Sequence, residues 1–140
     1  MAPSPSLAAF TAPICEFCVV HRDRTNTPLQ ALVTLNDPQF VEAARHLAQL
    51  AIQHADDEDG VLDYLTDQVL CRPITETERE ILHHTKADFL AHYQARPDDA
   101  RALVAVGESA VSDQLDAIGL AAWTMVANLV LCLDEVVTKN

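Results

Sequence analysis

The sequence predicts an all-α fold, a small irregular helical bundle of about five to six helices. Apolar residues recur at intervals of three and four positions along most of the chain. Gly is scarce, at 3 of 140 residues, while Ala and Leu are abundant. Pro and capping residues recur where helices would begin. We expect residues 1–27 to form an irregular N-terminal segment and residues 28–140 to form the helical domain.

The first helix is predicted over about residues 28–35. Thr27 and Gln30 fit a capping box, in which Thr27 accepts a hydrogen bond from a free backbone N–H and Gln30 reaches back. Pro28 occupies the first helical position, where its missing N–H costs nothing.

The second helix is predicted over about residues 38–54. Asp37 is the expected N-cap and Pro38 the first helical residue, and apolar residues follow at helical spacing. The apolar side chains between Leu29 and Phe40 are expected to contact the core.

The next two helices are predicted over about residues 60–71 and 76–95. The acidic stretch DDEDG at 56–60 separates the first of them from the preceding helix and is interpreted as a solvated turn. Thr75 and Glu78 fit another capping box.

A short helix is predicted from Pro97 to a stop near Gly107, and a long one follows it. The segment from Ile118 to Leu133 is interrupted only by Thr124 and Asn128. Apolar on most sides, it is expected to form the central buried helix.

Composition limits the partners. The formal charge is −12 with only nine Lys plus Arg, so nucleic acid is not an expected partner. No apolar run reaches the ~18 residues of a transmembrane segment. The N-terminus lacks the charged start and continuous apolar stretch of a secretory signal.

The N-terminal segment holds candidate metal ligands, Cys15, Cys18 and His21. Zinc accepts such a C-x2-C-x2-H pattern, but a closed site needs a fourth ligand from elsewhere. A disulfide and free thiols are the alternatives for these cysteines and for Cys71 and Cys132. Val19 follows the second cysteine, where haem attachment would require His.

No catalytic motif stands out. GxSxG, Walker and GxGxxG patterns are missing from the sequence, and we expect no cofactor. The polar residues that helix formation leaves unexplained are candidates for ligand binding, because Arg recognises anions and Asn recognises hydroxyls: Arg22, Arg24, Asn26 and Asn36.

Two blocks, RTNTPLQALVTLNDPQFVEAAR (24–45) and AAWTMVANLVLCLDEVVTKN (121–140), resemble the C-terminal part of a planctomycete-specific domain of unknown function. Proteins of that family are large and exported. They usually carry a second planctomycete-specific domain before this one, and often a cytochrome c-like domain. The resemblance implies a cell-envelope context as part of a longer protein, with upstream family domains as packing partners.

The sequence therefore favours a non-catalytic helical module, the C-terminal piece of a larger exported protein. It would pack against an upstream domain or self-associate. The alternative is a ligand- or substrate-binding half-site of a larger envelope enzyme, formed by the four polar residues named above.

Overall fold

A computed structural model describes residues 28–112 and 115–137, and within these ranges every regular element is a helix. The all-α prediction is confirmed. The helices are α2 (Pro28–Asn36), α3 (Pro38–His54), α4 (Glu58–Leu70), α5 (Glu76–Ala95), α6 (Pro97–Val104), α7 (Ala117–Leu131) and α8 (Asp134–Val137).

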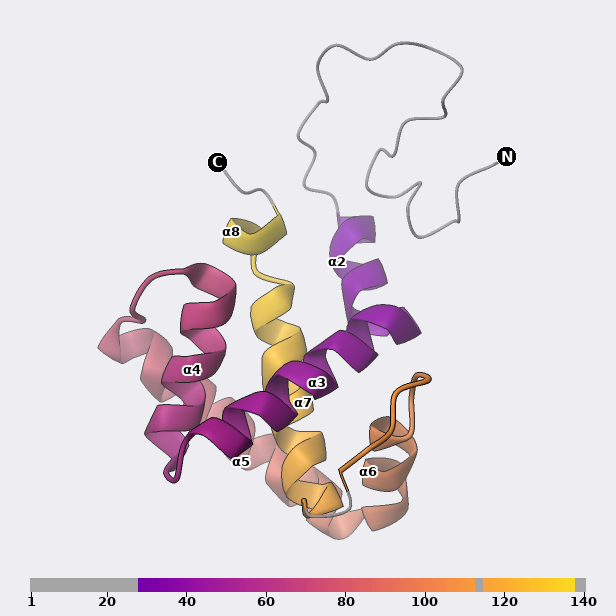
Figure 1. Cartoon of the computed structure of the whole chain (residues 1–140). Coiled ribbons are helices and arrows are strands. Elements are labelled where there is room, and N and C mark those ends of the chain that lie inside the picture. Colours follow the sequence, from indigo (N-terminus) through magenta and orange to yellow (C-terminus); the bar gives the residue numbers. More distant parts are fainter. Residues whose placement is uncertain (1–27, 113–114, 138–140) are drawn as a thin grey trace, which may run out of the picture.

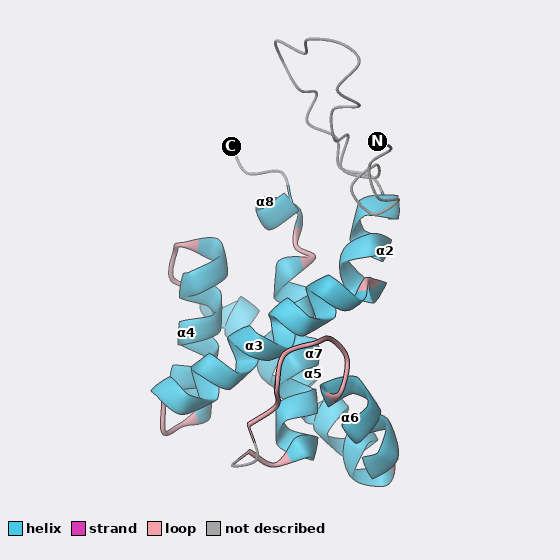
Figure 2. Cartoon of the chain, turned by 45° about the vertical axis from the view of Figure 1, so that its right-hand side comes forward, coloured by secondary structure: helices cyan, strands magenta, loops and turns pink. Residues whose placement is uncertain are grey.

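The apolar helix α7 lies at the centre of the bundle, as predicted. Figures 1 and 2 show α3 crossing it on one side, with α5 and α6 around its first half. Small residues on α3 allow the two helices to approach closely, since Ala44, Ala48 and Ala51 are fully buried. From α7 itself, Leu120, Val126 and several alanines complete the core.

The local start signals account for most helix boundaries. Asp37 accepts a hydrogen bond from the Gln39 N–H at 3.0 Å. Thr75 and Glu78 form the complete capping box at the start of α5. Both predictions are confirmed. The capping box predicted for Thr27 involves a residue outside the described ranges.

The acidic stretch is more ordered than the predicted solvated turn. Helix α4 begins at Glu58, two residues earlier than expected, because Asp57 is its N-cap and accepts from the Gly60 N–H at 3.0 Å. At the other end of the chain, α7 stops at Leu131, and residues Asp134–Val137 form the separate short helix α8.

The expected core contacts are wrong for two leucines of α2, Leu29 and Leu32. Leu29 and Leu32 are 57% and 55% exposed, whereas Gln30 and Thr34 are 2% and 3% exposed. The hydroxyl of Thr34 donates to the Gln30 carbonyl at 3.0 Å, so its polar group is satisfied inside the helix. Helix α2 thus turns Gln30 and Thr34 inward and Leu29 and Leu32 to the surface.

Candidate functional site

Only one of the four predicted ligand-binding residues can be placed. Arg22, Arg24 and Asn26 lie outside the described residues, whereas Asn36 is the exposed last residue of α2. Its side-chain amide donates to the Leu32 carbonyl at 2.8 Å. That bond stays within α2, which is a structural role.

The predicted metal candidates Cys15, Cys18 and His21 also lie outside the described residues. Within the described part of the chain, no three His, Cys, Asp or Glu side chains gather as a metal site would require. Cys71 and Cys132 are free thiols there, and partial burial raises the pKa of the Cys132 thiol.

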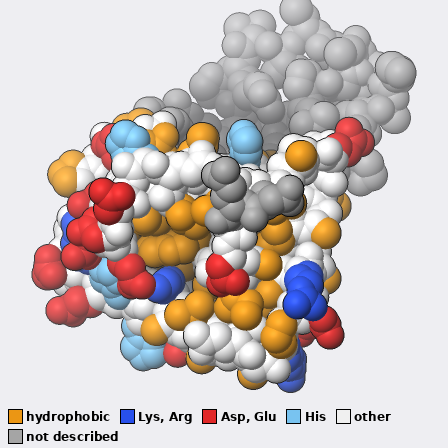
Figure 3. Space-filling model, turned by 60° about the horizontal axis from the view of Figure 1, so that its bottom comes forward, with side chains coloured by type: hydrophobic (Ala, Val, Ile, Leu, Met, Phe, Trp, Pro, Cys, Tyr) orange, Lys and Arg blue, Asp and Glu red, His pale blue; other side chains and the backbone are white. Residues whose placement is uncertain are grey.

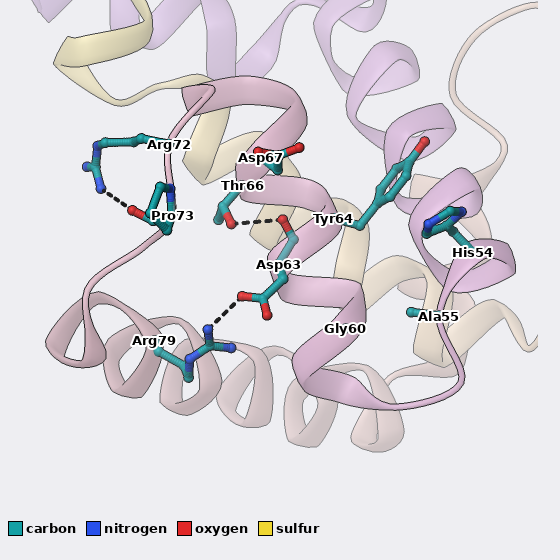
Figure 4. A pocket seen from close by; sticks show the side chains of 10 residues that line it. All are labelled: His54, Ala55, Gly60, Asp63, Tyr64, Thr66, Asp67, Arg72, Pro73 and Arg79. Atoms are coloured by element: carbon teal, nitrogen blue, oxygen red, sulfur yellow. Dashed lines mark hydrogen bonds and ion pairs between the residues drawn. The ribbon is translucent and has the colours of Figure 1, made fainter.

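A depression on the described surface follows α4, and we call it the α4 groove. Its volume is about 570 Å³. Figure 4 shows the aromatic pair of Tyr64 and His54 on one side of α4 and the Asp63–Arg79 pair on the other. The rings of the aromatic pair lie 4.6 Å apart. The groove is lined by His54, Ala55, Gly60, Asp63, Tyr64, Thr66, Asp67, Arg72, Pro73 and Arg79.

Ion pairs between α4 and α5 neutralise one wall of the groove. Arg79 donates to Asp63 at 2.6 Å and to Asp59 at 3.4 Å. His83 lies 2.8 Å from the same Asp59 oxygen and, with Arg79, lowers the pKa of that carboxyl. These ion pairs join α5 to α4, and Asp63 also lines the groove.

A second ion cluster joins three segments at the other end of the groove. The Arg72 guanidinium donates to both oxygens of Glu78 on α5 and to both oxygens of Glu135 on α8. The hydrogen bonds from Arg72, followed by those from Thr75, lower the pKa of Glu78 to about 2. Bidentate geometry of this kind fixes the relative position of the partners.

Arg45 on α3 forms a polar centre that the sequence did not reveal. It is 1% exposed, and its Nη2 donates to the carbonyl and hydroxyl oxygens of Ser109 at 3.0 and 2.6 Å. Its Nε and Nη1 have no hydrogen-bond partner among the residues that the structure describes. Arg45 and Ser109 lie 64 positions apart in the sequence, so no local pattern could have predicted their contact.

Glu42, one turn before Arg45, binds the backbone of the loop that contains Ser109. One of its oxygens accepts from the backbone N–H groups of Glu108 and Ser109 at 3.1 and 2.6 Å. Hydrogen bonds from the Ser109 hydroxyl and these N–H groups lower the pKa of Glu42. Gly107 is required here, since its φ is 101° and a Cβ would collide with the Glu42 carboxylate.

These polar contacts connect structural elements. Across residues 28–112 and 115–137, no hydrogen bond joins a Ser or Cys side chain to a His as nucleophilic catalysis would need. The hydroxyl of Ser109 is held by Arg45, and the adjacent His83 and His84 contact different carboxylates, Asp59 and Asp88. The described side chains cap helices, pair charges and anchor a loop.

Fold and site together define an all-α protein whose described polar clusters hold its helices in place. Residues 1–85 match the PSD1 family, described as a protein of unknown function (DUF1553). The match covers more than half of the 140 residues, so the chain belongs to the PSD1 family. It includes the first resembling block, 24–45. The second block, 121–140, lies outside the match, and its assignment to the family's C-terminal part stays a prediction.

Neither the curated proteins nor the solved structures contain a match to this chain. Among the described helices, none has the length and apolar character needed to cross a membrane.

Proposed function

We propose that this chain is a non-catalytic helical module, residues 28–140, that forms the C-terminal part of a larger exported PSD1 protein. In this proposal the leucine face of α2 packs against an upstream family domain. We define the leucine face as Leu29 and Leu32.

The observation that carries the proposal is the orientation of α2. Burial of a Leu side chain contributes about 1.5–3 kcal/mol, and polar side chains normally take the solvent side of a surface helix. Here the two leucines are exposed while Gln30 and Thr34 are buried. An apolar face presented outward is typical of a surface that another protein element covers. Helix α2 also lies within the residues that match the family.

The test measures association and dye binding of the purified chain. We expect the wild-type chain to bind a hydrophobic dye and to self-associate as its concentration rises, because Leu29 and Leu32 are more than half exposed. The double variant Leu29→Glu/Leu32→Glu should bind less dye and remain monomeric by light scattering. Its unfolding midpoint should stay close to that of the wild type, because both side chains are exposed.

A matched control replaces exposed apolar residues elsewhere. Ile81 on α5 and Leu50 on α3 are 58% and 43% exposed, so the double variant Ile81→Glu/Leu50→Glu adds the same two charges at exposed positions. It should leave association unchanged. A wild-type chain that stays monomeric, binds no dye and unfolds in one sharp transition would contradict the proposal.

The alternative is ligand binding by Arg22, Arg24, Asn26 and Asn36, as a half-site of a larger envelope enzyme. It is supported by the exposure of Asn36, whose amide nitrogen alone is used by the bond to Leu32. Alanine replacements separate the two functions. Lost ligand binding at unchanged stability would support a site, and lost stability would support a structural role.

A further inference from the structure

A second cavity lies where the end of α3 meets the starts of α4 and α7, and we call it the α7 cavity. Its volume is about 250 Å³. The floor is apolar and includes Ile52, Val61, Leu120 and Trp123. It is at the opposite end of α3 from α2, and the 17 residues of α3 span about 25 Å. The cavity is therefore separate from the leucine face.

Four carboxylates line the cavity along with this floor: Asp56, Asp57, Glu58 and Asp116. Helix capping explains two of them. Asp57 accepts from the Gly60 N–H at 3.0 Å, and Asp116 accepts from the Gly119 N–H at 2.8 Å. Each cap bond uses one oxygen of its carboxylate. Figure 3 shows the lower face of the molecule, where hydrophobic side chains gather in a hollow bordered by Asp and Glu.

The lining of the cavity contains more carboxylates than cationic side chains. None of the lining residues is Lys, Arg or His. The nearest described ammonium is that of Lys86, which pairs with Glu58 and lies 5.4 Å from the centre of the Trp123 ring. This ion pair balances one carboxylate, so Asp56, Asp57 and Asp116 leave the cavity with a net negative charge. Lys86 also shows that Trp123 accepts a cation beside its ring.

A ligand that fits must place a cation at the carboxylates and an apolar portion on the floor. Lys and Arg side chains do both, because their alkyl stems pack on apolar surfaces while their charged ends stay among polar groups. The volume is below the roughly 300–1,000 Å³ of pockets for drug-sized ligands, which suits a single side chain. The formal charge of −12 attracts basic partners and repels anions.

We propose that the α7 cavity binds a Lys or Arg side chain from a basic peptide segment of a partner protein. The carboxylates of Asp56, Asp57 and Asp116 bind the cationic group, and the apolar floor contacts the alkyl stem. This partner site goes beyond the proposed function, which uses the leucine face at the other end of α3.

Trp123 supplies the readout, since it is the chain's one tryptophan and it lines the cavity. The probe is an acetylated and amidated peptide, Gly-Leu-Lys-Lys-Leu-Gly. Its titration should change the Trp123 fluorescence saturably, and replacing both lysines with norleucine should weaken binding at least about tenfold. Norleucine keeps the alkyl stem and removes the charge.

The variant that tests the carboxylates is Asp56→Asn/Asp57→Asn/Asp116→Asn. Asn caps a helix about as well as Asp, so the triple variant removes charge while preserving the helix starts. We expect it to weaken peptide binding about tenfold. The control Asp88→Asn/Asp98→Asn/Asp99→Asn changes the net charge equally at residues outside the cavity and should stay within about twofold of the wild type.

Three results would overturn the proposal. Equal weakening by the control triple would mean that only net charge attracts the peptide. Equal binding of the norleucine peptide would mean that the cavity selects no cation. Displacement of the peptide by 1 mM calcium chloride, with the same fluorescence change from calcium alone, would indicate a metal-ion site. If the triple variant does not fold, the single variant Asp56→Asn, which alters no cap, must still weaken binding.

Discussion

Helices α7 and α2 are both rich in apolar residues, yet they use them in opposite ways. Along α7, nearly every side chain from Leu120 to Val130 is buried, and the hydroxyl of Thr124 donates to the Leu120 carbonyl inside the helix. Along α2, the buried positions are Gln30 and Thr34, and two leucines face solvent.

The difference comes from the number of neighbouring helices. Helix α7 contacts α3, α5, α6 and α4, so every side of it has something to pack against. Helix α2 packs mainly against α3 and α7, and lies at one end of the molecule (Figure 1). Apolar composition therefore predicts burial only where enough of the fold surrounds a helix.

The largest expected effect contrasts a leucine from each helix. Leu120→Ala removes a fully buried side chain and should lower the free energy of unfolding by about 2–5 kcal/mol. Leu32→Ala removes an exposed one and should change it by less than about 0.5 kcal/mol. Urea unfolding of the dilute monomer measures both. A cost above about 2 kcal/mol for Leu32→Ala would mean that the leucine face is covered within the chain itself.

The next effect tests a polar contact between the two helices. Asn128 of α7 is 1% exposed, and its Nδ2 donates to the Leu35 carbonyl at 3.1 Å. Leu35 is among the last four residues of α2, whose carbonyls lack intrahelical partners. Asn128→Ala should leave this carbonyl unpaired and cost about 1–3 kcal/mol.

Thr124→Val provides the comparison within α7. Its hydroxyl bonds only within its own helix, so we expect a smaller loss than for Asn128→Ala when urea midpoints are compared. Equal losses would show that the contact between α2 and α7 contributes nothing of its own.

Signals confined to three or four residues were sufficient to predict where helices begin. Asp37–Pro38 and the Thr75/Glu78 box both act locally, and both are present. An Asp three residues before a helical N–H is another such local signal, and reading Asp57 as an N-cap would have moved the start of α4 to its observed position. The sequence alone therefore predicted the all-α class and most helix limits.

Contacts between distant residues could not be predicted in this way. Nothing near Arg45 indicates that it is buried against Ser109, because the loop that holds Ser109 is brought there by α6 and α7. Hydrophobic spacing also assigned the α2 leucines to the core, whereas the position of α2 beside α3 and α7 selects its polar face for burial. The candidate polar residues at 22–26 lie outside the described ranges and stay predictions.

The smallest expected effect concerns the ion pairs that Arg72 forms next to the C-terminal end of α7. Arg72 joins Glu78 of α5 to Glu135 of α8, directly after α7, whereas the described ion pairs include no residue of α2. Because the pKa of Glu78 falls from 4.5 to about 2 in the folded chain, its charge stabilises the fold above pH 4.5. That contribution is lost as the pH falls toward 2. Since both side chains are about one-third exposed, we expect less than about 1 kcal/mol.

Glu78→Gln measures this contribution, because Gln also completes a capping box and only the charge is lost. At pH 7 the wild type should be the more stable protein by thermal or urea unfolding. The gap should narrow as the pH falls below 4.5 and close only below about pH 2, where Glu78 is protonated in both the folded and the unfolded chain. A gap that stays constant down to pH 2 would show that the difference in stability between Glu78 and Gln does not come from the carboxylate charge. The end of α7 would then be held, like α2, without a contribution from charge.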